Sequence, residues 1–285
     1  MTITKLNNIL LRKSPGGDTV LVSSPNLPKE ISFINENQIT KVEINDYYYD
    51  LNEINFLSEC PGIEQITINH FYLKDYSGIY NLKNLKTLDI GETEKNNILM
   101  LNELPFLESL YCYWTPKITG LNFQVNLQEL LIWKYAPKER DLSVLFDLTK
   151  LKFLNLTQPK IDSLNGIQKL NNLEHVEVNN SRTLYNIETI KELKNSLKKL
   201  EINQCKNINN IHEIEHLINL EYLIFSDCGE VPSINFVGGL KNLNHFSFDG
   251  TTVLNGDLSP CIGIEYVNFT DKKHYSHSRK DFMYD

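Results

Sequence analysis

A phrase of about 22 residues recurs along most of this 285-residue chain and limits what the chain can fold into. Its clearest copy begins at Leu151, continues with Leu154 and Leu156, and then places an apolar residue at every third position until Leu173 starts the next copy. The alternation of Leu154 and Leu156 is typical of a strand with one buried face. The later spacing of three indicates a tight helical or 3-10 return segment.

The phrase is repeated at intervals of about 20 to 24 residues, which is regular enough to predict one strand and one return per copy. Its first apolar residue falls at Ile39, Ile63, Leu85, Leu107, Leu127, Leu151, Leu173, Leu197, Leu220, Leu243 and Ile264. At the ninth position of a copy, a polar or thiol side chain is suited to satisfying buried backbone groups in the turn. The residues of this kind are Thr93, Thr115, Ser181, Cys205, Cys228 and Thr251.

These residues resemble the leucine-rich repeat superfamily over about residues 39 to 269, most closely its internalin-like or phosphatase-regulator-like class with roughly 22-residue repeats. The resemblance implies an α/β fold, a right-handed solenoid with a parallel β-sheet of about eleven strands on its concave side. The convex returns are then short helical, 3-10 or extended segments. The resemblance also implies a protein ligand on the concave side. Surface internalins carry a secretion signal, a helical cap, an Ig-like segment and a wall anchor; we find none of these in the sequence and do not expect a host-adhesion role.

The repeat predicts three regions. Residues 1–38 lack the phrase, and two apolar runs flank the turn cluster Ser14–Asp18, so we expect an N-terminal cap containing a β-hairpin. Residues 39–270 form the repeat array, whose open end needs such a cap because it exposes apolar core and an unpaired strand edge. Residues 271–285 are polar and are expected to form a C-terminal tail or cap.

Composition narrows the class of ligand. A net charge of −8 disfavours nucleic acid and an anionic membrane as ligands and suits a partner with a basic surface. The first residues do not form a signal peptide, and no run approaches ~20 apolar residues, so we expect a cytoplasmic, monomeric, bacterial protein. The repeat explains all five cysteines as structural, and we favour free thiols over a Cys205–Cys228 disulfide in a reducing compartment.

The repeat also predicts which side chains face the concave side. Both tryptophans, Trp114 and Trp133, fall at outward positions on adjacent strands, and exposed Trp and Tyr side chains mark interaction sites. The alternative is that an irregular return covers and buries them. Acidic side chains flank this aromatic group. Aromatic and acidic side chains together indicate a binding site for a basic protein. The predicted partner-binding residues are Asp89, Tyr111, Tyr113, Trp114, Glu129, Leu131, Trp133, Tyr135, Phe153, Glu177, Glu201 and Tyr222.

One motif points to a different class of function. His212, Glu213 and His216 match the HExxH pattern, in which two histidines bind zinc and the glutamate is a general base. The repeat instead places these residues on the convex surface, so catalysis is a remote alternative, and we expect neither a metal nor another cofactor.

The sequence thus predicts a non-enzymatic module that binds a basic protein partner on its concave face. A small acidic binder of this kind suits an immunity (antitoxin) protein that blocks a basic toxin domain. The alternative within the same class is a scaffold or regulatory subunit of a cellular enzyme. The identity of the partner is not encoded in the fold.

Overall fold

The structure is a computed structural model that describes residues 2–92 and 98–282. The chain forms two compact units, Met1–Leu127 and Gln128–Asp285, and each is described by itself below. The two units meet after Leu127, whereas the predicted cap, repeat array and tail meet after residues 38 and 270. The predicted division therefore stays a prediction. None of the helices formed by the described residues is both long and apolar enough to cross a membrane.

The first unit begins with an antiparallel hairpin and continues into parallel repeat strands. Its elements up to the first repeat are β1 (Thr2–Leu6), β2 (Ile9–Lys13), β3 (Thr19–Leu21), η1 (Ser24–Asn26) and α1 (Leu27–Glu36). Strands β2 and β3 pair antiparallel, and the turn between them is closed by the Ser14 hydroxyl, which donates to the Gly17 carbonyl at 2.7 Å. Strand β3 then pairs in parallel with the first repeat strand, so the hairpin covers the edge of the repeat sheet.

The repeat strands of the first unit follow in chain order. They are β4 (Lys41–Asn45), β5 (Gln65–Asn69), β6 (Thr87–Ile90) and β8 (Ser109–Tyr113), each parallel to the next. The returns contain η2 (Asn55–Glu59), η3 (Ser77–Asn81), β7 (Leu99–Met100), η4 (Leu101–Glu103), β9 (Ile118–Thr119) and η5 (Leu121–Phe123). Gln124 replaces the usual apolar residue here and is nevertheless buried, because its amide donates to the Leu101 carbonyl at 2.7 Å.

The second unit consists of seven parallel repeat strands. They are β10 (Glu129–Trp133), β11 (Phe153–Thr157), β12 (His175–Asn179), β13 (Lys199–Asn203), β14 (Tyr222–Ser226), β16 (His245–Ser247) and β18 (Tyr266–Asn268). The returns contain η6 (Ser143–Leu145), η7 (Ile167–Lys169), η8 (Glu188–Leu193), η9 (Ile211–His216), β15 (Glu230–Val231), η10 (Asn235–Gly239), β17 (Thr252–Val253) and η11 (Ser259–Cys261); η12 (Arg279–Phe282) closes the described chain.

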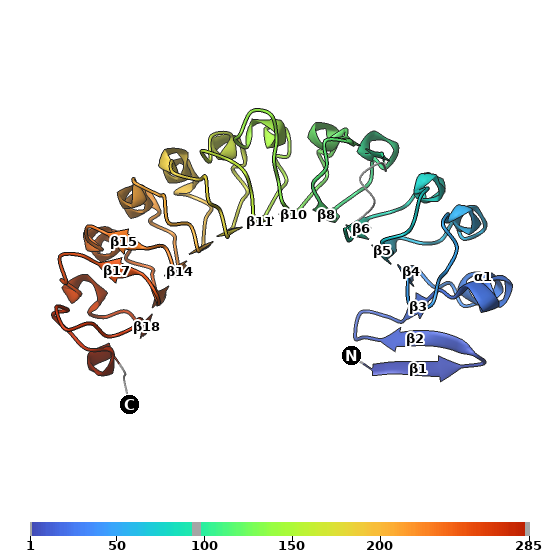
Figure 1. Ribbon diagram of the computed structural model, residues 1–285, viewed down its shortest axis with the longest axis horizontal. Helices are drawn as coiled ribbons and strands as arrows, with labels where there is room; N and C mark the ends of the chain where they lie inside the picture. The colour runs from blue at the N-terminus through green and yellow to red at the C-terminus, as the bar shows by residue number, and fades with distance from the viewer. Residues whose placement is uncertain (1, 93–97, 283–285) are drawn as a thin grey trace. The chain divides into compact units, whose positions relative to one another are not determined.

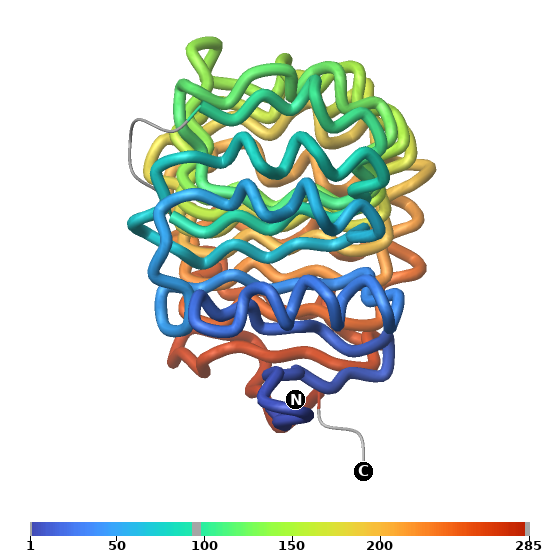
Figure 2. Tube along the Cα trace, turned by 90° about the vertical axis from the view of Figure 1, so that its right-hand side faces the viewer, coloured from blue at the N-terminus to red at the C-terminus, as the bar shows by residue number. Residues whose placement is uncertain are grey.

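Each copy of the sequence phrase therefore forms one strand, which confirms the predicted leucine-rich repeat fold and its eleven repeat strands, four in the first unit and seven in the second. In Figure 1 the strands of each unit lie along one side and the 3-10 helices along the other. Figure 2 shows successive turns of the chain running beside one another within each unit. Between strand and return lies the core, in which Leu154, Leu156 and Ile167 have no exposed surface.

The ninth position of the repeat behaves as predicted in the second unit. Ser181 and Thr251 are buried, and their hydroxyls donate to the carbonyls of Pro159 and Phe225 in the preceding turns, at 3.2 and 2.8 Å. These bonds satisfy carbonyl groups that would otherwise be buried without partners. Thr93, which is predicted to satisfy buried backbone groups in the same way, lies outside the described residues.

The described cysteines are all buried free thiols, as the sequence indicated. Burial raises the pKa of Cys205 to about 11 and that of Cys228 to about 12, so both thiols are protonated near neutral pH. Their sulfur atoms lie within 3.6 and 3.4 Å of the carbonyls of Val178 and Ile202 in preceding turns. The thiols thus take the place of the Ser and Thr hydroxyls of neighbouring repeats.

The end of the second unit is covered by the last described residues of the chain. Phe282 is 4% exposed and lies against Phe269, with ring centroids 5.9 Å apart. The Tyr275 hydroxyl accepts a hydrogen bond from the Val253 amide at 3.1 Å. Residues 271–282 therefore shield the apolar end of the last repeat from solvent.

Candidate protein-interaction face

The side chains that alternate with the buried ones along each strand lie on the sheet surface away from the 3-10 helices, which we call the open face. Within the second unit the parallel register aligns these side chains in rows that cross the strands. The first row consists of Glu129, Phe153, His175, Lys199, Tyr222, His245 and Tyr266. The second consists of Leu131, Asn155, Glu177, Glu201, Ile224, Ser247 and Asn268.

Aromatic rings fill most of the first row and contact one another. His245 is stacked between Tyr222 and Tyr266, with centroid separations of 3.9 and 4.3 Å and an interplanar angle of 15° on both sides. The Lys199 ammonium lies 4.8 Å from the centre of the Tyr222 ring, a cation–π contact. Tyr266 ends the row and is 49% exposed. From Lys199 to Tyr266 the row is thus an aromatic and cationic strip that is held by its own contacts and remains open to solvent at its end.

Burial in this stack affects the charge of His245. Desolvation lowers the pKa of His245 below its ordinary value; the Glu201 carboxylate acts to raise this pKa, and the Lys199 ammonium acts to lower it further. The imidazole is therefore neutral at pH 7 and presents an aromatic face to its neighbours.

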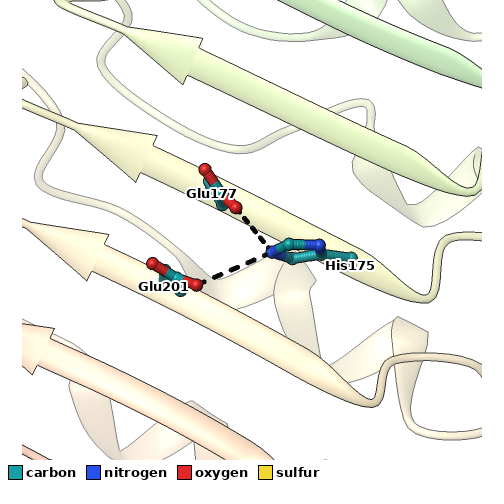
Figure 3. A group of neighbouring side chains, drawn as sticks. All are labelled: His175, Glu177 and Glu201. Carbon is teal, nitrogen blue, oxygen red and sulfur yellow. Dashed lines mark ion pairs between the residues drawn. The ribbon is translucent and has the colours of Figure 1, made fainter. Parts of the chain in front are cut away.

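His175 and Glu177 on β12 and Glu201 on β13 form a compact polar group on the same face (Figure 3). Lys199 on β13 joins this group through Glu201. The His175 Nε2 atom is 2.7 Å from a Glu177 oxygen and 3.8 Å from a Glu201 oxygen. The Lys199 ammonium lies 2.7 Å from that same Glu201 oxygen. Each carboxylate of the group therefore has a basic neighbour.

These contacts shift the pKa values of Glu201 and Lys199. The neighbouring His175 imidazole lowers the pKa of the Glu201 carboxyl, partial burial acts in the opposite direction, and the Lys199 ammonium lowers it again. Burial acts to lower the pKa of Lys199, but the hydrogen bond and the negative charge of Glu201 outweigh it, so this pKa is raised. Both groups are charged at neutral pH.

The same group is the place where the described residues could hold a metal ion, because one ligand atom from each of His175, Glu177 and Glu201 lies within 4.8 Å of the others. Imidazole and carboxylate are ligands of zinc and related metals. However, Lys199 already supplies a positive charge at the Glu201 oxygen. The arrangement is that of a polar network in which the side chains contact one another.

The predicted aromatic centre falls on both units. Tyr111 and Tyr113 on β8, with Trp114 directly after it, belong to the first unit, whereas Leu131 and Trp133 on β10 belong to the second. All five side chains are half-buried, so the return segments do not bury them. A binding site that joins Trp114 to Trp133 stays a prediction.

Tyr135 was also predicted to surround the tryptophans, and this is wrong. The side chain has no exposed surface and belongs to the core of the second unit. The physical reason is the repeat itself, because Tyr135 stands at the ninth position counted from Leu127, the same position as the buried Ser181. Counting the register through Tyr135 would have predicted its burial.

The acidic side chains are less available than the sequence suggested. Besides Glu177 and Glu201, Glu43 on β4 accepts hydrogen bonds at 2.7 to 3.0 Å from the Arg12 guanidinium on β2. Asp89 on β6 is half-buried, and burial, followed by the charge of Glu43, raises its pKa. Glu129 is exposed. Arg12 on β2 thus neutralises Glu43, one of the acidic side chains on the strands of the first unit.

The HExxH motif lies on the return surface and lacks the geometry of a zinc site. It forms part of the 3-10 helix η9, in which residues three apart are aligned, so His212 and His216 do not lie on one face as they would in an α-helix. The Glu213 carboxylate is 3.2 Å from the Lys191 ammonium. The Nε2 atoms of His212 and His216 lie 3.7 and 3.9 Å from different oxygens of Glu213. Among the described residues, however, the three ligand-type atoms that lie within 4.8 Å of one another do not belong to this motif.

The repeat register predicts that all residues of the first row face outward, but only part of the row was predicted to bind a partner. Phe153 and Tyr222 were predicted as binding residues, but His175, Lys199, His245 and Tyr266, which join or extend them, were not selected. The available signal was that all six stand at the same position of consecutive repeats.

Comparisons with known proteins agree with this architecture. No protein-family model matches the sequence, and no curated protein matches it. Among solved structures, the chain is similar to an internalin, InlF, from Listeria monocytogenes, with a TM-score of 0.66 and 18% identity over 85% of this chain and 70% of that one. It also matches internalin C2 (InlC2) from Listeria monocytogenes, with a TM-score of 0.39 and 15% identity over 77% of this chain and 76% of that one. The likeness to InlF shows the fold, a leucine-rich repeat solenoid of the internalin kind.

Proposed function

We propose that this chain is a non-enzymatic protein-binding module whose open face engages a partner protein with a basic surface. The observation that carries the proposal is the aligned row of half-exposed aromatic and charged side chains from Phe153 to Tyr266. Tyr and Trp side chains dominate the energetics of protein interfaces, particularly where their rotamers are already fixed. In this row, stacking against His245 fixes Tyr222 and Tyr266 before any partner arrives.

Charge supports the choice of a basic partner. The chain carries a net charge of −8, so its field accelerates association with a positively charged protein and slows association with nucleic acid. We propose that the biological role is that of an immunity protein against a basic toxin domain, acting in the cytoplasm. The alternative is a regulatory or scaffold subunit, for which the partner is a cellular enzyme.

Affinity capture from the source cell tests the proposal. Three double variants are compared with the wild-type chain: Trp114→Ala/Trp133→Ala, Tyr222→Ala/Tyr266→Ala, and the control Phe123→Ala/Tyr185→Ala. The control residues are 66% and 48% exposed and lie in return segments, away from the open face. We expect the first two variants to lose the captured protein and the control to retain it. Equal retention by all four proteins would contradict the proposal, and the identity of the captured protein distinguishes a toxin from a cellular enzyme.

A further inference from the structure

A second surface of the second unit has the opposite charge character. An open groove with a volume of about 1050 Å³ lies beyond the carboxyl ends of β10 to β14, where parallel strands end at the same edge of the sheet. Its walls carry two recurring kinds of side chain, cations and amides, at Gln158, Lys160, Asn180, Arg182, Gln204 and Lys206.

The cations are aligned by the repeat. Lys160, Arg182 and Lys206 each stand at the tenth position of a copy of the phrase, so consecutive turns place them beside one another at the strand spacing of ~4.8 Å. All three are exposed, and no ion pair joins any of them to another described residue. Arg140, at one end of the groove, differs because it is paired with Asp162 at 2.5 Å. Three adjacent cations without partners among the described residues form a local basic strip on an acidic chain.

The amides form a second row beside the cations. Gln158, Asn180 and Gln204 stand at the eighth position and adopt left-handed backbone angles, with φ of 55°, 60° and 55°. Their backbone N–H groups donate across to the next turn at 2.7, 2.8 and 2.9 Å, which fixes the backbone. No described residue hydrogen-bonds to their side chains, which therefore remain open to a ligand. A carboxamide both donates and accepts, as recognition of a peptide main chain requires.

The side chains that line the groove favour an acidic peptide over a single-stranded nucleic acid as its ligand. Proteins that bind single-stranded nucleic acid stack bases on aromatic side chains, and none of the groove-lining residues is aromatic. Asp227 lines the far end of the groove, and the net charge of −8 also opposes a phosphate backbone. An extended peptide, in contrast, points alternate side chains to one side at intervals of ~6.6 to 6.8 Å, which flexible Lys and Arg side chains can match.

We propose that this groove binds an extended acidic segment of a partner protein. Carboxylates at alternate positions of the segment meet Lys160, Arg182 and Lys206, and its main chain is held by the amides of Gln158, Asn180 and Gln204. Exposed ion pairs are individually weak, so binding is modest and falls as salt concentration rises. This surface is distinct from the open face, and the proposal does not depend on the function proposed above.

Fluorescence anisotropy with the full chain tests the proposal. The probes are a labelled peptide of alternating Glu and Ser, the matched peptide of alternating Gln and Ser, and an oligothymidylate of equal length. The variant Lys160→Glu/Arg182→Glu/Lys206→Glu is compared with the control Lys169→Glu/Lys194→Glu/Lys272→Glu, which changes the net charge equally at exposed positions outside the groove. Circular dichroism verifies that both variants are folded.

We expect the wild-type chain to bind the Glu-containing peptide at least tenfold more tightly than the Gln-containing peptide. The groove variant should lose at least tenfold in affinity, and the control should stay within about twofold of the wild type. Tighter binding of oligothymidylate, an equal loss in the control, or no preference for the acidic peptide would each overturn the proposal. Displacement of the peptide by inorganic phosphate at the same molar concentration would also overturn it, because the site would then recognise a free anion.

Discussion

Glu30 is a carboxylate without exposed surface in the first unit, and hydrogen bonds from Ser23 offset part of the cost of its burial. The Ser23 amide and hydroxyl donate to the two carboxylate oxygens at 2.8 and 2.7 Å. Glu30→Ala leaves both donors without an acceptor in a buried place, so we expect a loss of about 1 to 3 kcal/mol in the free energy of unfolding. Glu30→Gln retains an acceptor for the amide and a donor for the hydroxyl, and should stay within about 1 kcal/mol of the wild type. Chemical denaturation of the three proteins measures both values.

The same pair predicts a dependence of stability on pH. Burial raises the pKa of Glu30, and the hydrogen bonds from Ser23 act in the opposite direction without cancelling it. The folded chain therefore holds this proton more tightly than the unfolded chain does, and the resulting stabilisation is present below the ordinary glutamate pKa and lost as the pH rises through the raised one. Glu30→Gln cannot lose a proton, so the stability of the wild type relative to this variant should fall over that pH range. A constant difference would contradict the assignment.

Replacing Tyr135 and Tyr222 in turn tests which of the two side chains lies in the core and which lies on the open face. The Tyr135 side chain is fully buried, so Tyr135→Ala leaves a large cavity and should lower the free energy of unfolding by about 3 to 5 kcal/mol. Tyr222→Ala, which removes the same atoms from a half-exposed ring, should cost clearly less. Thermal denaturation of the two variants decides the point, and equal losses would place Tyr222 in the core instead of on the open face.

At the scale of an element, the residues that cover the last repeat depend on Gly256. A Cβ atom there would lie 2.2 Å from the His274 carbonyl oxygen, and φ is +68°, which L-residues rarely adopt. Gly263 has a φ of +92°, but a Cβ atom added to it would meet no heavy atom within 4 Å. Gly263→Ala therefore measures the free-energy cost of a positive φ alone, without a steric clash. We expect Gly263→Ala to cost about 1 to 2 kcal/mol and Gly256→Ala to cost more.

Hydrogen exchange distinguishes the two glycine variants further. The Ser276 amide donates to the Gly256 carbonyl at 2.8 Å, so this amide should lose protection when Gly256→Ala displaces the covering segment. In Gly263→Ala the Ser276 amide should exchange as in the wild type. Unchanged protection in both variants would show that residues 271–282 do not depend on this close approach.

The aromatic row makes a prediction for His245. Because burial lowers the pKa of His245, removing the ring of Tyr222 should expose the imidazole and raise that pKa toward its ordinary value. In the wild type the lowered pKa also means that stability is lost as the pH falls through the ordinary histidine pKa. NMR titration of the histidine ring protons in the wild type and in Tyr222→Ala measures the change, and the resonances of His212, on the return surface, serve as the control. An unchanged pKa for His245 would contradict the stacked arrangement.

How much the sequence predicts differs between elements for a physical reason. Leu154 and Leu156 fix the face of their strand because burial is dictated by a period that local sequence displays. The ion pair between Lys199 and Glu201 joins two residues of β13, and the pair between Arg12 and Glu43 joins β2 to β4. Both pairs depend on side-chain conformations, which no local period encodes. The predicted acidic field was therefore too strong, because it counted charges without their partners.

A different limit applies to elements outside the repeat. The turn at Ser14–Asp18 has its own sequence signal, and the structure places a hairpin there. The first strand, Thr2–Leu6, and the helix Leu27–Glu36 have no repeat to reinforce them and were not predicted as separate elements. For the candidate site, the repeat register predicted the outward positions of the whole row but not the stacking of His245 between Tyr222 and Tyr266.

At the scale of the whole molecule, the two surfaces of the second unit divide by chemistry. The open face offers aromatic side chains together with charges that already have partners, whereas the groove offers the cations of Lys160, Arg182 and Lys206, which form no ion pair with another described residue. Hydrophobic and aromatic contacts provide lasting affinity, while unpaired exposed charges provide weaker attraction that salt screens. We therefore expect binding at the open face to persist at salt concentrations that abolish binding at the groove.

Whether the open face binds the partner is best answered by hydroxyl-radical footprinting of the chain, alone and with its captured partner, because this method reports the solvent exposure of individual side chains. We predict that Phe153, Tyr222 and Tyr266 become protected in the complex, while Phe123 and Tyr185, in the return segments, keep their reactivity. Protection of Phe123 and Tyr185 with unchanged reactivity at the three open-face residues would contradict the proposed binding face and place the partner on the opposite side of the sheet.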